Sequence, residues 1–201
     1  MRLPSLWLER ASWIVGITLL SMYGGMRLWA EESRANAVEQ YRLATVPTAD
    51  QSLWSPQRVA AYAAAQKADD APQALLRIPM LTLEVPVYGD SSDFNLDRGA
   101  GHIPGTTDLV EAGNIGIAAH RDGFFRKLKD VKLGMDIFID HGGRTLRYSI
   151  VEISVVLPEE AAVLAPTDKP SVTLVTCYPF YFVGSAPKRY IVRGELDETQ
   201  T

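Results

Sequence analysis

The sequence predicts an all-β domain with minor helices, preceded by an apolar N-terminal segment and a polar connecting segment. Three observations support this prediction. Residues 11–30 are almost entirely apolar, residues 31–73 are polar with one alanine-rich run, and residues 74–201 contain short β-rich runs separated by Gly, Pro and Asp. No long helical pattern alternates with the β runs, so a closed or sandwich-like β domain is favoured over a parallel α/β sheet.

Residues 1–30 are predicted to form an N-terminal membrane anchor. Residues 11–30 carry a single charge, Arg27, and a helix of about 20 residues is roughly 30 Å long, which is the thickness of a hydrocarbon core. Leu28-Trp29-Ala30 fits a signal-peptidase site poorly, so a retained single-pass helix is favoured over a cleaved signal peptide. The flanking basic residues only weakly favour a cytoplasmic N-terminus.

Residues 31–73 are predicted to form a stalk that contains one surface helix. Ser55 and Pro56 open an alanine-rich run that continues to Lys67. Serine followed by proline is typical of a helix N-cap and the first helical position. The helix is therefore expected to begin at this pair.

Residues 74–201 are predicted to form the β domain, with seven or eight strands. The runs with the composition of strands are 74–79, 81–89, 114–120, 135–140, 144–157, 171–177 and 189–196. His141-Gly142-Gly143-Arg144 is predicted to be a tight hairpin turn. Residues 124–131 are expected to form one or two helical turns.

Composition and spacing argue against several kinds of partner and cofactor. The 201 residues carry a net charge of −4, so no electrostatic feature favours a nucleic-acid partner. The chain has one cysteine and therefore no intramolecular disulfide. Its cysteine and histidines lack the paired close spacing of structural zinc sites. Asp90, Asp93 and Asp97 lack the EF-hand pattern and are interpreted as turn and capping residues, so neither a metal nor another cofactor is expected.

Cys177 is the candidate nucleophile. It ends a β run and is followed by Tyr178-Pro179, which stops the strand, so its side chain can face a cleft. A nucleophilic thiol needs a base or a cation beside it. Of the three histidines, His120 also ends an apolar β run and is the candidate acid–base group, whereas His102 and His141 are interpreted as structural.

Arg189 is the candidate group for stabilising an oxyanion. It begins a β run after Cys177, and the alternation of side chains along a strand allows it to face the same side as the sulfur. An ordinary solvated arginine within Lys188-Arg189 is the alternative, and spacing does not decide between the two.

These segments resemble those of the sortase family. Residues 173–177 (TLVTC) resemble the TLxTC signature, residues 117–121 resemble the segment with the catalytic histidine, and residues 189–192 resemble the arginine strand. The three segments occur in the family's order, and the resemblance covers residues 74–196. Ala119 departs from the glycine that many relatives carry before the histidine.

Further segments resemble class D sortases or the related Gram-negative group most. These segments are Ile78-Pro79, Val85-Pro86-Val87, the loop Gly99-Ala100-Gly101-His102, and Tyr178-Pro179-Phe180 after the cysteine.

The resemblance implies an eight-stranded β-barrel at the cell membrane, outside the cytoplasm, that cleaves a C-terminal sorting signal of LPxTG type. Cys177 would form a thioester with the signal, His120 would move protons to and from the amines, and Arg189 would hold the reacting carbonyl. Thr176 is a further candidate for a substrate contact. The implied partners are the sorting-signal peptides of secreted proteins and an amine acceptor, either a cell-wall precursor or a pilin lysine.

Two alternative functions remain open at this point. One is another cell-envelope peptidase or transpeptidase with a Cys–His pair, although papain-type enzymes place the cysteine at the start of a helix and Cys177 ends a β run. The other is a non-catalytic, membrane-tethered β domain that binds a partner protein, with Cys177 merely buried. The stalk lacks a DPW- or DPF-like lid anchor, so an open cleft is expected. Residues 180–183 could either contact an apolar signal peptide or pack on the barrel.

Overall fold

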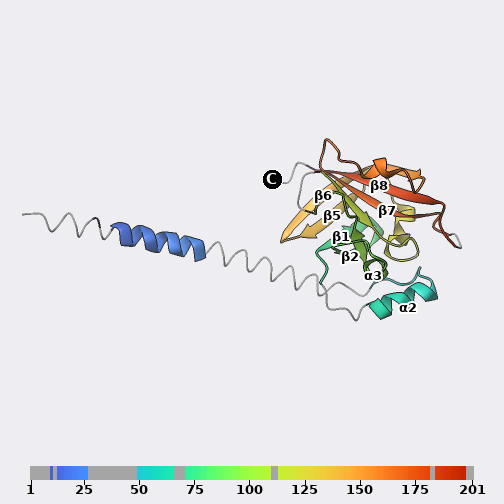
Figure 1. The fold of residues 1–201 in the computed structure, drawn as a ribbon, viewed down its shortest axis with the longest axis horizontal. Coiled ribbons are helices and arrows are strands. Elements are labelled where there is room, and N and C mark those ends of the chain that lie inside the picture. The colour runs from blue at the N-terminus through green and yellow to red at the C-terminus, as the bar shows by residue number, and fades with distance from the viewer. Residues whose placement is uncertain are drawn as a thin grey trace, which may run out of the picture.

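The computed structural model describes residues 10, 13–26, 49–65, 71–109, 113–181 and 184–197. Residues 13–26 are helical and lie within the predicted anchor (Figure 1). Their apolar side chains are exposed, as shown by Leu20 at 71%. Within these described ranges, no helix combines the length and apolarity needed to cross a membrane. The rest of the predicted anchor and residues 31–48 of the predicted stalk lie outside the described residues, so the membrane anchor stays a prediction.

Eight strands close into a barrel (Figure 1). The strands are β1 (Ala74–Ile78), β2 (Leu83–Tyr88), β3 (Ala100–His102), β4 (Asn114–Ala118), β5 (Asp136–His141), β6 (Arg144–Val156), β7 (Ser171–Tyr178) and β8 (Lys188–Leu196). Their order around the barrel is β1-β2-β3-β4-β7-β8-β6-β5, and β5 pairs with β1 to close it. The predicted all-β class is confirmed, and the closed barrel is the correct one of the two favoured architectures.

The interior of the barrel is filled by aliphatic side chains from alternating strand positions. The largest fully buried ones include Leu76, Ile115, Ile139 and Leu174. Full burial of such a side chain stabilises the fold by roughly 1.5–3 kcal/mol. The strand positions between them face outward, so the outer surface of the sheet is free to carry polar and reactive groups.

The predicted hairpin between β5 and β6 is confirmed. His141 pairs with Arg144, and Gly142 and Gly143 between them have φ values of 55° and 75°. Two consecutive residues with positive φ are the requirement of a tight hairpin turn, and glycine meets it without steric cost.

Strand β3 and helix α3 (Asp93–Arg98) were not expected from the sequence. β3 has only three residues and contains Gly101, where a Cβ atom would lie 2.1 Å from the carbonyl oxygen of Asp90. The close approach of the two backbones therefore requires glycine at this position. Because glycine has no side chain, the segment lacks the residue types by which a strand is recognised in a sequence. Three short 3₁₀ helices, η1 (Pro79–Leu81), η2 (Phe124–Asp130) and η3 (Ala161–Leu164), complete the fold, and η2 is the helical turn predicted at 124–131.

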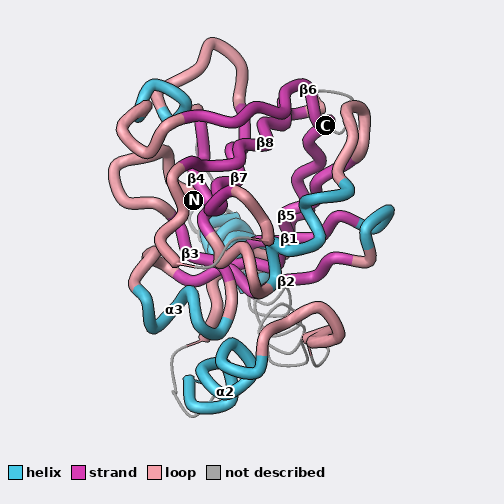
Figure 2. The backbone as a smooth tube through the Cα atoms, turned by 90° about the vertical axis from the view of Figure 1, so that its right-hand side faces the viewer, coloured by secondary structure: helices cyan, strands magenta, loops and turns pink. Residues whose placement is uncertain are grey.

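Helix α2 (Pro56–Ala65) is the helix expected within residues 31–73. The Ser55 side-chain oxygen accepts a hydrogen bond from the Arg58 backbone N–H at 3.2 Å, as an N-cap does. Trp54 and Tyr62 make edge-to-face contacts with Phe124 of η2, with ring centroids 4.9 Å and 5.9 Å away. Figure 2 shows α2 next to α3. The helix therefore packs against the barrel domain.

We expect the aromatic contact between α2 and η2 to contribute strongly to stability. Phe124 is only 7% exposed, so Phe124→Ala should lower the free energy of unfolding by about 3 kcal/mol, through lost burial and the cavity left behind. Urea denaturation of the full chain in detergent, followed by tryptophan fluorescence, measures this change. Leu133→Ala is the control, because Leu133 is 63% exposed. Equal losses in the two variants would contradict the packing of α2 on η2.

Candidate active site

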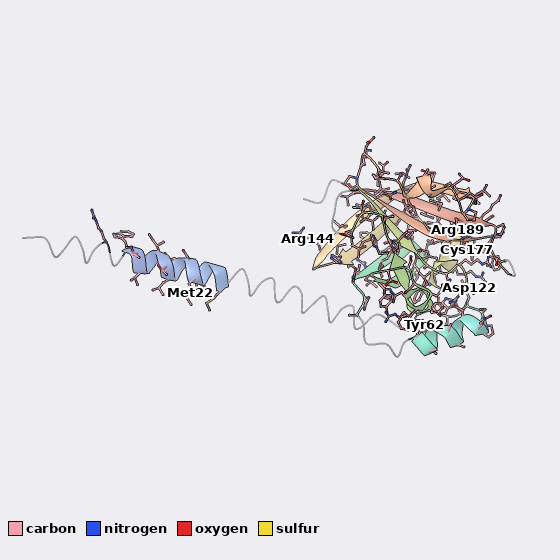
Figure 3. All side chains as sticks on the ribbon, in the orientation of Figure 1. Met22, Tyr62, Asp122, Arg144, Cys177 and Arg189 are labelled. Atoms are coloured by element: carbon pink, nitrogen blue, oxygen red, sulfur yellow. The ribbon has the colours of Figure 1, made fainter. Side chains whose placement is uncertain are left out.

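Cys177 and Arg189 lie directly opposite each other on neighbouring strands. They are register partners in the antiparallel pair of β7 and β8. Residues at such positions point to the same face of a sheet, with Cβ atoms about 5 Å apart. Both residues are half-buried, and Figure 3 shows them at the same end of the barrel. The thiol and the guanidinium group therefore share one outer face.

His120 follows β4, the other neighbour of β7. The parallel register pairs Ala118 with Val175, and the Ala119 N–H continues it by donating to the Val175 carbonyl at 3.2 Å. Two residues further along each strand, His120 lies level with Cys177 and on the same face, because side chains alternate. Their burial agrees with this register. Ala119 and Thr176 are 5% and 2% exposed, whereas His120 and Cys177 are half-buried.

Thr176 points into the barrel, away from the face that carries Cys177. Its hydroxyl donates a hydrogen bond to the carbonyl oxygen of Ala119 at 2.8 Å. The hydroxyl therefore ties β7 to the residue that precedes His120. Because the hydroxyl is engaged in this way, a substrate contact by Thr176 would have to come from its backbone, and that contact stays a prediction.

His120 lies within a group of charged side chains. Its Nε2 atom is 3.5 Å from Oδ1 of Asp97, and the same carboxylate oxygen also contacts Nη1 of Arg58. Arg58 further donates from Nε to Asp122 at 3.2 Å. Burial and the positive charge of Arg58 hold the pKa of His120 below its ordinary value, against the opposing effect of Asp122, Asp97 and Asp93. The neutral imidazole is therefore favoured at neutral pH.

Arg58, Asp97 and Asp122 were missed by the sequence analysis. Asp90 has the turn role that was expected, since its carboxylate accepts from the backbone N–H of Ser92 at 2.8 Å. Asp97 differs, because it contacts Arg58 and His120. Arg58 is 39 residues from Asp97 and 64 from Asp122 in sequence. No local pattern joins residues so far apart, and only the packing of α2 on the barrel brings them together.

Arginines that follow His120 contact the described residues of the loop between β7 and β8. Arg121 donates to the carbonyl oxygens of Pro179 at 3.2 Å and Gly184 at 2.8 Å. Arg126 of η2 donates to the carbonyl oxygen of Phe180. The guanidinium group of Arg189 donates to the carbonyl oxygens of Ala186 at 3.4 Å and Lys188 at 3.1 Å. The described residues on both sides of the gap at 182–183 therefore accept hydrogen bonds from arginines.

The aromatic side chains of this loop differ in their surroundings. Phe180 is buried and packs against the ring of Tyr190 with centroids 5.0 Å apart, so it belongs to the barrel. Tyr181 is exposed, and the centroid of its ring lies 4.3 Å from the guanidinium carbon of Arg126. Residues 182–183 lie outside the described residues, so for them the choice between contact with a peptide and packing on the barrel stays open.

The other histidines have structural surroundings. His102 is buried, and its Nε2 atom lies 2.9 Å from the carbonyl oxygen of Thr107. His141 Nδ1 lies 2.8 Å from the carbonyl oxygen of Gln73. Within the described part of the chain, no group of three or more His, Cys, Asp or Glu could hold a metal ion.

A cavity of about 410 Å³ lies between residues 49–54 and the barrel. Its lining does not include Cys177, His120 or Arg189.

The chain is similar to sortases in both sequence and structure. A family model described as the Sortase domain matches residues 76–197. Sortase D of Bacillus subtilis (strain 168) is 32% identical over 124 residues, which cover 60% of this chain and 62% of that protein. The chain therefore spans about three fifths of the length of this curated relative.

Two solved structures have the same fold. A Sortase D5 transpeptidase from Clostridium perfringens is 25% identical, with a TM-score of 0.57 over 72% of this chain and 89% of that chain. A lid mutant of Sortase A from Corynebacterium diphtheriae is 27% identical, with a TM-score of 0.62 over 87% of this chain and 96% of that chain. The sequence-based resemblance to sortases is thus confirmed.

The hydrogen bond of Thr176 leads to a prediction about stability. Thr176→Val keeps the shape of the side chain but removes the donor to the buried Ala119 carbonyl, so it should lower the free energy of unfolding by about 1–2 kcal/mol. Urea denaturation of the full chain in detergent measures this loss. Thr176→Ser retains the hydroxyl and should lose less. If valine proved as stable as threonine, the hydroxyl would not hold the end of β4.

Proposed function

This chain belongs to the sortase family, and we propose that it is a cysteine transpeptidase that cleaves an LPxTG-like C-terminal sorting signal. The acyl part of the substrate, which ends at the threonine of the signal, would be transferred to an amine. The observation that supports this proposal most is the position of Cys177 between two neighbours, with Arg189 opposite it on β8 and His120 level with it after β4. Acyl transfer by a thiol needs these three kinds of group on one face.

In the first half of the reaction, the Cys177 sulfur attacks the carbonyl carbon of the signal's threonine. The thiol proton passes to His120, and the carbonyl oxygen becomes an oxyanion that the Arg189 guanidinium group stabilises. As the intermediate collapses, the C–N bond breaks and His120 gives its proton to the leaving amine. The product is a thioester on Cys177 and a released C-terminal peptide.

In the second half, an incoming amine attacks the thioester. The amine loses a proton to His120, a new C–N bond forms, and the sulfur of Cys177 leaves and recovers its proton. His120 thus acts first as acid and then as base for the two amines. A lowered pKa of His120 suits this cycle, because a neutral imidazole can accept the proton of the thiol.

The location and the acceptor belong to the same proposal. The apolar composition of residues 11–30 supports a single-pass anchor that holds the barrel outside the cytoplasm, at the cell membrane. Substrates would be secreted proteins that carry a sorting signal at the C-terminus. The acceptor would be the amine of a cell-wall precursor or of a pilin lysine, which leads to surface anchoring or to pilus assembly.

The proposed reaction can be tested by mass spectrometry of the full chain in detergent, incubated with an LPxTG-like peptide. We expect an acyl adduct on Cys177 and, with hydroxylamine present, the peptide hydroxamate. Cys177→Ala should abolish both products. His120→Ala should slow turnover by about 10²–10⁴-fold, and Arg189→Ala by about 10²–10³-fold.

Arg144→Ala is the matched control for the arginine. Arg144 is exposed in the β5–β6 hairpin, and Figure 3 shows it on the opposite side of the barrel from Cys177. Its replacement should leave turnover unchanged. Retained turnover in Cys177→Ala would refute the proposed function.

A further inference from the structure

Helix α2 lies outside residues 76–197, the region matched by the Sortase domain model, yet it reaches the candidate acid–base residue. Arg58 is the side chain that makes this connection. We propose that Arg58 is a positioning residue of the active site, which holds the Asp97 carboxylate in place and counteracts its pull on the His120 imidazole. This inference rests on the proposed function, because it adds a residue to the same site.

The geometry of the contact supports a direct role for Arg58. Its side chain is 15% exposed, and it bridges Asp97 through Nη1 and Asp122 through Nε at 3.2 Å. His120 Nε2 lies 3.5 Å from the carboxylate oxygen of Asp97 that Arg58 contacts. This distance is long for a hydrogen bond, so Asp97 acts on the imidazole mainly through its charge. One oxygen therefore faces two groups that compete for it.

The position of Arg58 is fixed by packing as well as by charge. A Cβ atom placed on Gly123 would lie 3.5 Å from Cδ of Arg58 and 3.7 Å from Cβ of His120. The arginine stem and the histidine therefore rest on the same glycine. The Ser55 cap and the contacts of Trp54 and Tyr62 with η2 hold the helix that carries Arg58. Because packing already fixes these side chains, they lose little further conformational entropy when the ion pairs form.

The charged groups around His120 oppose one another. Arg58 faces it from α2, Asp97 and Asp93 face it from α3, and Asp122 faces it from the turn after β4. Cys177 lies level with it on β7, and Arg189 lies beyond Cys177 on β8. Burial and Arg58 lower the pKa of His120, while the three aspartates raise it. Loss of Arg58 should therefore raise this pKa, and loss of Asp97 should lower it.

The full chain in detergent allows a direct test, because it has only three histidines. NMR of ¹³C,¹⁵N-histidine-labelled protein follows each imidazole through a pH titration, and His120→Gln identifies the signal of His120. The variants are Arg58→Met, Arg58→Lys and Asp97→Asn. Gln57→Ala is the matched control, because Gln57 is an exposed neighbour on the same helix.

The proposal predicts opposite shifts for the two partners. The pKa of His120 should rise in Arg58→Met, fall in Asp97→Asn and stay close to the native value in Arg58→Lys and Gln57→Ala. A purely steric role would affect Arg58→Met and Arg58→Lys alike. Turnover of the signal peptide should fall by about 10- to 100-fold in Arg58→Met and Asp97→Asn, in kcat rather than in KM, and remain unchanged in Gln57→Ala.

Either of two titration results would overturn the inference. One is the same His120 pKa in Arg58→Met as in Arg58→Lys. The other is an unchanged or raised His120 pKa in Asp97→Asn, which would show that the Asp97 carboxylate does not pull on the imidazole. Asp97→Asn keeps the shape of the side chain, so this result can be obtained even if Arg58→Met does not fold. The titrations need no substrate, so they are read separately from the adduct experiment, in which a native chain without a Cys177 thioester refutes the proposed function.

Discussion

The hydrogen-bonded register of β7 with its two neighbours is the constraint on which the candidate site depends. A shift of one residue would turn Thr176 outward and Cys177 into the barrel, because successive side chains point to opposite faces. Two buried hydrogen bonds hold the correct register against β4. Thr176 donates to the Ala119 carbonyl at 2.8 Å, and Thr173 donates to the side chain of Asn114 at 2.7 Å. Both threonines therefore help to align the reactive face, and Thr176 does so from the opposite face, inside the barrel.

Around this rigid sheet, arginines set the positions of the more irregular segments. Arg121 and Arg126 bind carbonyl oxygens of the loop after Cys177, and Arg58 joins α2 to the carboxylates near His120. Carbonyl oxygens and carboxylates at chain turns are well matched by the several donors of a guanidinium group. Backbone pairing thus places Cys177, His120 and Arg189, and charged contacts hold α2 and the loop after Cys177 around them.

The sequence predicted a site residue where a reactive side chain stands at the end of a recognisable β run. Short β-rich runs bounded by Gly, Pro and Asp predicted seven of the strands, and the ends of two of these runs pointed to Cys177 and His120. β3 was missed because close backbone contact replaces its side chains with glycine. Arg58, Asp97 and Asp122 were missed for another reason. Each is an ordinary surface-type residue on a separate segment, and their meeting is a property of tertiary packing that no local pattern encodes.

The parallel pairing of β4 with β7 also affects when the site can come into existence. Residues 119–170, which include β5 and β6, separate these two adjacent strands in the chain. Contacts across so long an interval form late, because the chain entropy of closing the loop must be overcome first. A nascent polypeptide contains His120 before Cys177 has been added, and the two side chains can meet only after β7 has paired with β4. The juxtaposition of thiol and imidazole is therefore a late product of folding, because it needs the non-local pairing of β4 with β7.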